Sequence, residues 1–381
     1  MIDELKNISF YVSEKIKVNS ISYKDYISTE NMIPNKGGVD VAEELPTASS
    51  VSMYQKDDVL VSNIRPYFRK IWFSNRTGGC SNDVIVFRVR DSEETYPKFL
   101  YYLLSQDSFF NYMMAGSNGT KMPRGNKKLI LGYKFKNIGH NQQKIVADTL
   151  SAYDDLIENN QKQIKLLEEA AMRLYKEWFV DLRFPEHGNT AIVEGVPEGW
   201  EKKQLSEIAD VVMGQSPKSE YYNGRRQGIP FHQGVTNYGE RFVSNEIFTT
   251  SFTRSADMGS ILFSVRAPVG RMNITKVKIA IGRGLSAINH KTNLQSLLFY
   301  MLKSRFYKDD LIGNGSIYAS ITKDELFEQC FLIPSEELSQ NFNNIASKID
   351  RDIVVIDAET ILLIEARDKL LPKLMSGEIE V

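Results

Sequence analysis

Two stretches in the first half of the chain place Arg, Lys and Asn on segments that read as exposed loops. SNIRPYFRK (62–70) follows a β-branched apolar run, and GSNGTKMPRGNKK (116–128) is rich in Gly and Asn. Guanidinium, ammonium and amide groups donate hydrogen bonds to phosphate oxygens and to base edges in the DNA grooves. We therefore predict DNA contacts for Asn63, Arg65, Arg69, Lys70, Asn118, Thr120, Lys121, Arg124, Lys127 and Lys128.

Three stretches of the second half have the same character: GQSPKSEYYNGRRQG (214–228), SVRAPVGR (264–271) and GNGSIYAS (313–320). They add Gln215, Lys218, Arg225, Arg226, Arg266, Arg271, Asn314, Ser316 and Tyr318 to the predicted DNA contacts. A solvated basic loop is the alternative for each single residue, but the two halves place these loops at corresponding points. If Arg65 or Arg266 reads a base, its replacement by Ala should weaken binding by about 1–3 kcal/mol.

The charge of the chain is unevenly distributed, although the net charge is only −1. Neither Asp nor Glu occurs from Ser108 to Ala147 or from Met258 to Lys308, and both zones contain many Lys and Arg residues. Acidic residues gather elsewhere, as in Glu168 and Glu169. A local basic surface captures phosphate whatever the net charge of the whole chain.

Motifs of phosphate-binding and metal-dependent enzymes are missing from the sequence. There is no G-x-x-x-x-G-K-[ST], AIGRG (280–284) lacks the G-x-G-x-x-G spacing, and the 4 histidines are scattered. The Asn/Asp-Pro-Pro-aromatic motif of adenine methyltransferases is also missing. Cys80 and Cys330 lie far apart, which argues against a Cys-based zinc site. We predict no catalytic residue, no metal site and no cofactor held by this chain itself.

Two long heptad patterns indicate the helices that must position these loops. The first consists of Leu150, Ile157, Ile164, Ala171 and Trp178, with Tyr153, Asn160, Leu167 and Leu174 between them. The second consists of Ile349, Ile356, Leu363 and Leu370, with Ile353, Thr360, Arg367 and Leu374 between them. Pro185 is expected to end the first helix, and Pro372 to kink or end the second near its last turn.

Each heptad helix needs an apolar partner, and the other helix is the nearest one available. An antiparallel pair of helices, each ~50 Å long, would hold two globular domains at opposite ends. Two unrelated helices packed into separate cores are the alternative. Trp178 and Phe179, at the end of the first helix, are predicted to bind a partner subunit, or else to cap the helical seam.

The globular segments that precede the two helices resemble each other. DDVLVSNIRPYFRKI (57–71) is similar to MGSILFSVRAPVGRM (258–272). Aromatic stretches follow at Tyr96–Tyr112 and Leu297–Tyr307, with a helical spacing typical of core packing. We predict an α+β fold with an internal pseudo-twofold repeat, in which two mixed α/β domains are separated by two long helices paired as an antiparallel coiled coil. The predicted boundaries are 1–140 and 186–337 for the domains, and 141–185 and 338–381 for the helical spacers.

Length and hydropathy suggest a cytoplasmic protein. The 381 residues suit two or three domains. No apolar run approaches the length of a membrane span, and MIDELKNISF does not resemble a secretory signal. The cysteine content, 2 residues, suits a reducing compartment.

Four blocks give the chain a family resemblance over essentially its whole length. They are YISTENMIPNKGGV (26–39), NQQKIVADTLSAYDDLIENNQKQIKLLEEAAMRLYKEWFVDLRFP (141–185), VPEGWEKKQLSEIADVVMGQSP (196–217) and RDKLLPKLMSGEI (367–379). Together they resemble the specificity subunits of type I restriction–modification systems. The resemblance implies two target-recognition domains, each reading one half of a bipartite DNA site, with a coiled coil that sets the spacer between the halves.

The resemblance also implies partners. A subunit of this kind is non-catalytic and binds double-stranded DNA together with two modification subunits, which bind S-adenosylmethionine and methylate adenine. Restriction subunits then complete an ATP-dependent endonuclease that translocates DNA. Two alternatives are a specificity subunit of a methylation-only system, and a coiled-coil scaffold that binds no DNA.

Overall fold

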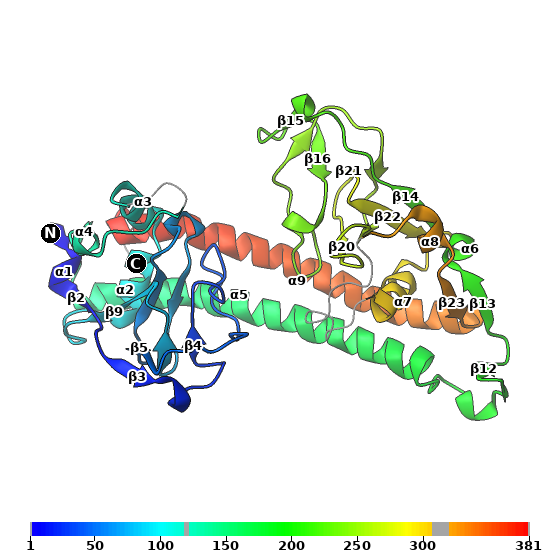
Figure 1. Cartoon of the computed structure of the whole chain (residues 1–381), viewed down its shortest axis with the longest axis horizontal. Coiled ribbons are helices and arrows are strands. Elements are labelled where there is room, and N and C mark those ends of the chain that lie inside the picture. Colours follow the sequence, from blue (N-terminus) through cyan, green and yellow to red (C-terminus); the bar gives the residue numbers. More distant parts are fainter. Residues whose placement is uncertain (1, 118–121, 307–319, 380–381) are drawn as a thin grey trace. The chain divides into compact units, whose positions relative to one another are not determined.

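The computed structural model describes residues 2–117, 122–306 and 320–379. Its contacts divide the chain into two units: unit 1 is Met1–Gln161 with Ala358–Val381, and unit 2 is Lys162–Asp357. Each unit contains an α/β domain and half of each of two long helices, α5 (His140–Tyr175) and α9 (Glu336–Ser376) (Figure 1).

Unit 1 is built on two four-stranded sheets. The first has the order β2 (Ser9–Tyr11), β9 (Val84–Val89), β6 (Val59–Ser62), β7 (Ile71–Phe73), and the second β3 (Lys15–Lys17), β5 (Ser50–Tyr54), β8 (Gly78–Cys80), β4 (Tyr26–Ile27). A small ladder joins β1 (Ile2–Glu4) to β10 (Lys134–Lys136), and the helices are α1 (Leu5–Ile8), α2 (Pro97–Leu104), α3 (Asp107–Ala115) and α4 (Lys127–Ile130). All four residues of β6 are buried, as an apolar run in a central strand requires.

Unit 2 repeats this plan. Its first sheet has the order β14 (Ala209–Met213), β22 (Leu285–His290), β19 (Ile261–Ser264), β20 (Met272–Ile274). The second has the order β15 (Tyr222–Asn223), β17 (Phe248–Thr249), β16 (Ile229–His232), β21 (Ile279–Ile281), β18 (Ser255–Ala256). The remaining elements are the ladders β11 (Ile192–Val193) with β12 (Val196–Pro197) and β13 (Glu201–Gln204) with β23 (Cys330–Ile333), and the helices α6 (Leu205–Ile208), α7 (Gln295–Phe306) and α8 (Lys323–Phe327).

The predicted internal repeat is confirmed by strand order and direction. In both units a short helix, α1 or α6, precedes the edge strand of the first sheet, and the later strands pair antiparallel in the same sequence. The second sheets share a core in which β4 pairs parallel with β8, and β16 with β21. They differ at the edges, because β3 extends the sheet of unit 1 while β17 and β15 extend that of unit 2 on the other side.

The aromatic stretches lie in the cores, as predicted. Phe99, Tyr102, Phe109 and Phe110 of α2 and α3 are buried between the first sheet of unit 1 and residues of α5 and α9. In unit 2, α7 is buried over Ser296–Leu302 and packs with Tyr175 and Phe342. Each domain core therefore includes the pair of long helices that crosses its own unit.

Within each unit, α5 and α9 run antiparallel, which confirms the predicted pairing (Figure 1). In unit 1 the Nδ2 of Asn160 donates to Glu359 at 3.2 Å, and the guanidinium of Arg367 donates to Asp154 at 2.7 Å. In unit 2 the rings of Tyr175 and Phe342 lie 5.7 Å apart.

Of the two seam rows expected in α9, the row with Ile353, Thr360 and Leu374 is buried, and the other row is only half-buried. Ala346, Ile353 and Thr360 are buried, whereas Ile349, Ile356, Leu363 and Leu370 are only half-buried. Arg367 is half-buried, and the carboxylates of Asp154 and Asp368 neutralise its charge.

The helix ends also differ from expectation. Regular α-helix in α5 ends at Tyr175 and continues as a short π-helical turn, Lys176–Val180, ahead of Pro185. Pro372 lies inside α9, which runs on to Ser376. Burial of Leu371, Leu374 and Met375 in the core of unit 1 holds this last turn in place despite the missing N–H of the proline. None of the helices in the described ranges has an apolar stretch long enough to cross a bilayer.

Candidate DNA interface

The two predicted DNA-contact stretches of unit 1 lie side by side. The N–H of Arg65 donates to the carbonyl of Pro123 at 2.8 Å, and the N–H of Gly125 donates to the carbonyl of Asn63 at 3.1 Å. These bonds close an isolated antiparallel bridge between Ile64 and Arg124. Side chains directly opposite in such a bridge stand on the same face. The fold therefore joins two loops that are about 60 residues apart in sequence into one surface.

Only part of this surface exposes its cationic side chains. The guanidinium of Arg124 is more than half exposed and lies 3.0 Å from the carboxylate of Asp83. Arg69 is half-buried, with 41% of its side chain exposed, and forms an ion pair with Asp107, at the start of α3, at 3.3 Å. Arg65 is half-buried, in a left-handed backbone conformation with φ of 48°.

Two predicted residues of this stretch are held in the domain itself. Asn63 is buried, at 7% exposure, so its amide does not reach a groove. The ammonium of Lys70 donates to the carbonyl of Thr29 at 2.6 Å, and burial lowers its pKa. Both residues support the loop, which leaves Arg69 and Arg124 as its accessible arginines.

Lys127 and Lys128 open the short helix α4 and are exposed. The side-chain oxygen of Asn126 accepts from the N–H of Lys128 at 3.0 Å, so it fixes the backbone from which both lysines project. Asn118, Thr120 and Lys121 lie outside the described residues.

Unit 2 contains the same bridge. The N–H of Ile321 donates to the carbonyl of Val265 at 2.9 Å, and Arg266 faces Ser320 across an antiparallel bridge. Arg266 and Arg271 are exposed, and the N–H of Arg271 donates to Ser264 Oγ at 2.8 Å. Asn314, Ser316 and Tyr318 lie outside the described residues.

The remaining predicted residues of unit 2 surround its extra edge strands. Asn223 holds the loop that carries Arg225 and Arg226: its Oδ1 accepts from the N–H groups of Arg225 and Gln227, at 3.1 and 3.0 Å. Both arginines are exposed. The other two predicted residues are also exposed, with Gln215 accepting from Thr253 Oγ1 at 3.1 Å and Lys218 lying 3.9 Å from Glu220.

Several basic residues of the second acid-free zone face the helices of unit 2. Lys276 donates to Asp357 at 2.5 Å, and Lys303 lies 2.9 Å from Glu168. Charge counting along the sequence missed these pairs, because their acidic partners lie on distant helices. These cations anchor the domain to α5 and α9, and so add less to an anion-binding surface than their number suggests.

Arg241, which sequence reasoning did not single out, is the most buried of these anchors. Its guanidinium donates to Glu168 on α5 at 3.0 Å, to Asp350 on α9 at 2.5 Å and to the hydroxyl of Tyr300 at 3.2 Å. Burial lowers the pKa of Arg241, but these neighbours raise it further than burial lowers it. A buried cation with two carboxylates fixes three elements of unit 2 together.

Of the two residues predicted to bind a partner, Phe179 lies in the core and Trp178 lies partly at the surface. Phe179 is buried against Tyr175, Trp200 and Phe342. Trp178 is half-buried and packs edge-on against Phe342, 6.0 Å away. Phe179 is thus a core residue of unit 2, and of the two residues only Trp178 keeps accessible surface.

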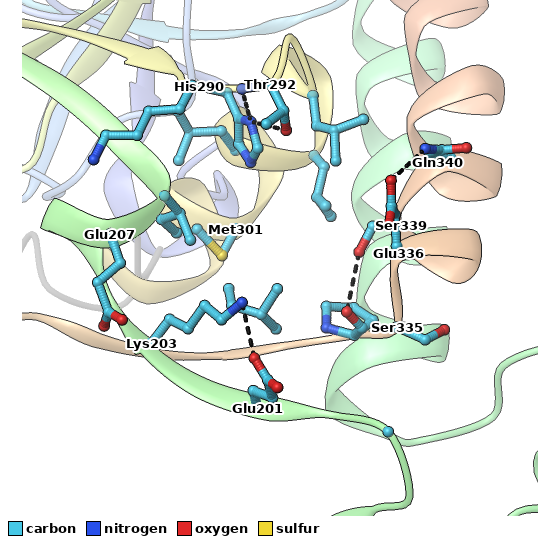
Figure 2. A pocket seen from close by; sticks show the side chains of 18 residues that line it. Glu201, Lys203, Glu207, His290, Thr292, Met301, Ser335, Glu336, Ser339 and Gln340 are labelled. Carbon is cyan, nitrogen blue, oxygen red and sulfur yellow. Dashed lines mark hydrogen bonds and ion pairs between the residues drawn. The ribbon is translucent and has the colours of Figure 1, made fainter.

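Unit 2 also has a pocket of about 510 Å³, and none of the predicted DNA-contact residues lines it. Figure 2 shows its polar rim, in which Lys203 pairs with Glu201 at 2.8 Å and Thr292 donates its N–H to His290 Nδ1 at 3.1 Å. Burial lowers the pKa of His290, in keeping with a neutral imidazole that accepts this bond. Among the described residues, no group of three His, Cys, Asp or Glu side chains is placed to hold a metal.

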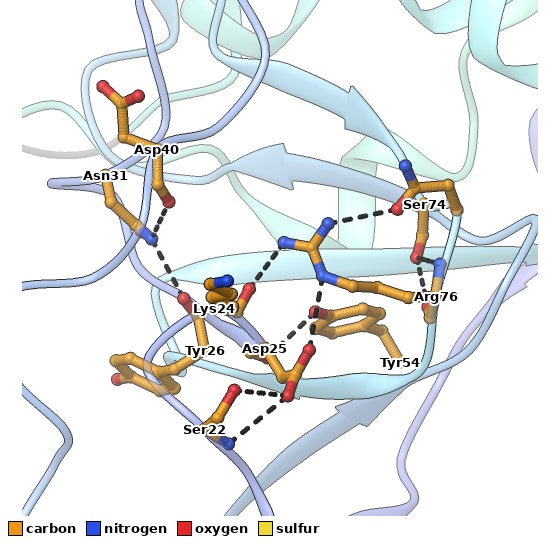
Figure 3. Close-up of polar contacts among 10 residues, drawn as sticks. Ser22, Lys24, Asp25, Tyr26, Asn31, Asp40, Tyr54, Ser74 and Arg76 are labelled. Atoms are coloured by element: carbon orange, nitrogen blue, oxygen red, sulfur yellow. Dashed lines mark hydrogen bonds and ion pairs between the residues drawn. The ribbon is translucent and has the colours of Figure 1, made fainter.

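A second arginine that the sequence did not signal, Arg76, holds a loop over the second sheet of unit 1. Its guanidinium donates to the carbonyl of Lys24 at 2.6 Å and lies 3.5 Å from Asp25 (Figure 3). It also stacks 4.8 Å from the ring centre of Trp72. The hydroxyl of Tyr54 donates to the carbonyl of Asp25 at 2.9 Å. These contacts make Arg76 a structural residue and not a member of the exposed basic surface.

Comparison with known proteins agrees with the duplicated design. The family model described as "Type I restriction modification DNA specificity domain" matches residues 9–169 and 197–365, once in each half of the chain. A solved type I restriction–modification system S subunit from M. genitalium is 17% identical, covers 98% of this chain and 96% of its own, and gives a TM-score of 0.58, which shows a shared fold.

Curated relatives point the same way. A putative type I restriction enzyme MjaX specificity subunit of Methanocaldococcus jannaschii is 31% identical over 75% of this chain and 68% of its own. The MjaIX specificity subunit of the same organism is 24% identical over 95% of this chain and 86% of its own. The chain belongs to the family of type I restriction–modification specificity subunits.

Proposed function

We propose that this chain is the DNA-sequence specificity subunit of a type I restriction–modification complex and has no catalytic role of its own. The two repeated domains would each bind one half of a bipartite site in double-stranded DNA. The observation that carries the proposal is the duplicated bridge with its exposed arginine, Arg124 in unit 1 and Arg266 in unit 2. A chain with two equivalent reading surfaces suits a target with two separate halves.

The long helices would set the number of unread base pairs between the half-sites. Support comes from their continuity: α5 has 36 residues and α9 has 41, and each contributes to both units. At about 1.5 Å per residue, removing two turns from both helices should shorten the spacer by roughly three base pairs, since each base pair rises about 3.4 Å. The half-site sequences should stay the same.

The chemistry would come from partners. Two modification subunits would bind S-adenosylmethionine and methylate adenine, and restriction subunits would add ATP-dependent cleavage, within the cytoplasm. Names of the relatives support this assembly. A methylation-only system remains the second candidate and predicts the same DNA motif without restriction.

The test uses the full chain with its cognate modification subunits and a pool of random duplexes. Retained duplexes are sequenced, and adenine methylation is mapped in cells with and without the gene. We expect one bipartite motif in both experiments. Retention without sequence preference at about 0.15 M salt, together with no change in the methylation pattern, would contradict the proposal. Adding restriction subunits and ATP then separates the two candidate systems.

A further inference from the structure

Because the two units repeat one fold, backbone hydrogen bonds show which residues of the two candidate interfaces are equivalent. The N–H of Ser62 donates to the carbonyl of Lys70, and the N–H of Ser264 donates to that of Arg271. The next residue, Asn63 or Val265, donates to Asp83 or Gly284. These bonds make Ser62 equivalent to Ser264, and Asn63 equivalent to Val265.

The other side of the bridge can be matched in the same way. Gly125 donates its N–H to Asn63, and Ile321 donates its N–H to Val265. Gly125 is therefore equivalent to Ile321, which makes Arg124 equivalent to Ser320. By the same register, Arg266 is equivalent to Ile64 and not to Arg65. The similar Arg-Pro patterns in the sequence thus place their arginines one residue apart.

Each bridge consequently carries one arginine, but on opposite partners. In unit 1 the arginine is Arg124 and its partner is Ile64, whereas in unit 2 the arginine is Arg266 and its partner is Ser320. Residues facing each other in a bridge have side chains on the same face, about 5 Å apart. Both domains thus present an arginine from the same bridge, but the arginine stands on opposite strands of that bridge in the two domains.

The surroundings of the two arginines differ in a way that suits reading of different sequences. Arg124 is oriented by Asp83, whose carboxylate lies 3.0 Å away. The position equivalent to Asp83 is Gly284 in unit 2, which has no side chain to orient Arg266. Arg283, next to this glycine, is exposed.

We propose that the bridge is the base-reading position of each domain, and that Arg124 and Arg266 each recognise a guanine, one in each half-site. This inference rests on the proposed function. Arg pairs through two parallel hydrogen bonds with O6 and N7 of guanine in the major groove, which is the commonest specific contact to a base.

The experiment compares Arg124→Ala, Arg124→Lys, Arg266→Ala and Arg266→Lys in the full chain with its modification subunits. Competition binding is measured on the wild-type site and on duplexes with each half-site base pair changed in turn. Both variants of Arg124 should lose about 10- to 100-fold discrimination at a single G·C pair in one half-site. Those of Arg266 should lose it in the other half-site only. Lysine should restore overall affinity better than it restores discrimination, since its flexible ammonium matches O6 and N7 of guanine less well than the planar guanidinium does.

Lys56→Ala is the matched control, because Lys56 is exposed in the turn before β6, at the opposite end of that strand from the bridge. It should leave every base preference unchanged, and thermal melting of each variant checks folding. Equal loss in both half-sites, or unchanged preferences, would overturn the base-reading assignment while leaving the proposed function standing. A wild-type complex that selects no sequence would overturn both.

Discussion

The hydroxyl of Tyr300 on α7 donates a hydrogen bond of 2.9 Å to the carboxylate of Asp350 on α9. The same pair occurs in unit 1, where Tyr102 on α2 donates to Asp154 on α5 at 2.5 Å. In both units the tyrosine belongs to the helix that follows the first sheet, and the aspartate to the long helix that follows that domain. The cation beside each aspartate differs: it is Arg241 from the domain in unit 2, and Arg367 from α9 in unit 1.

Replacing Tyr300 with Phe tests this anchor. Tyr300→Phe should lower the free energy of unfolding by about 1–2 kcal/mol, because Asp350 loses a hydrogen bond from a buried donor. Tyr102→Phe should have a similar effect through Asp154. Urea unfolding measures both, and Tyr23→Phe, at an exposed phenol, is the control. Equal midpoints for all three variants and the wild type would show that the anchors add nothing to stability.

Arg241→Met should destabilise unit 2 more strongly, by about 3–5 kcal/mol, because it leaves the poorly solvated Asp350 without its cation and Glu168 with Lys303 alone. Arg183→Ala provides the contrast. That side chain is 61% exposed and lies 3.3 Å from Glu177, so its loss should cost less than about 1 kcal/mol. Thermal and urea unfolding give the comparison, and equal losses for the two variants would contradict the anchoring role of Arg241.

Alanine substitutions at two glycines with positive φ distinguish the cost of a steric clash from the cost of backbone strain. Gly228 has φ of 86°, and a Cβ there would lie 2.0 Å from the carbonyl oxygen of Thr249. Gly38 has φ of 88°, and a Cβ there would meet no described atom within 4 Å. Gly38→Ala should cost about 1 kcal/mol, and Gly228→Ala about 1–3 kcal/mol more. Gly228→Ala should also disturb the loop that presents Arg225 and Arg226, which the DNA-binding assay would detect.

Stability should depend on pH through two histidines, the buried His232 and the half-buried His290. Burial lowers the pKa of His232 and of His290 from the ordinary value of 6.5. The folded protein then binds these protons less readily than the unfolded chain, so stability is complete above pH 6.5 and falls as the pH drops below it.

Urea unfolding at pH 7.5 and pH 5.5 measures this effect. His232→Gln should reduce the loss of stability between the two pH values, while the exposed His187→Gln should leave it unchanged. An undiminished loss in the His232 variant would show that other groups cause the pH dependence.

The sequence predicted those features that follow from regular spacing. Heptads at Leu150, Ile157 and Ile164 indicated the helix and its buried face, and similarity between 57–71 and 258–272 indicated the repeat. Helical spacing of the aromatic residues correctly predicted that they pack in the cores. These features are local, so periodicity alone is enough to find them.

Features that depend on pairing between distant elements could not be predicted in this way. Sequence similarity between the two halves suggested that Arg65 is equivalent to Arg266. The loop between β6 and β7, however, is one residue longer than the loop between β19 and β20, and this extra residue shifts the alignment. Lys276 and Lys303 looked like surface cations because Asp357 and Glu168 are far away in sequence. Whether the exposed cations contact bases or phosphates stays a prediction.

The division of the long helices between units has a consequence for how the chain is made. Unit 2 is one continuous segment, while unit 1 consists of two segments that enclose it in the sequence. Leu371, Leu374 and Met375 belong to the same core as Leu5 and Phe99. During synthesis on the ribosome, unit 1 therefore cannot complete its core until almost the entire polypeptide has been made. Unit 2 can complete its core as soon as its own continuous segment has emerged.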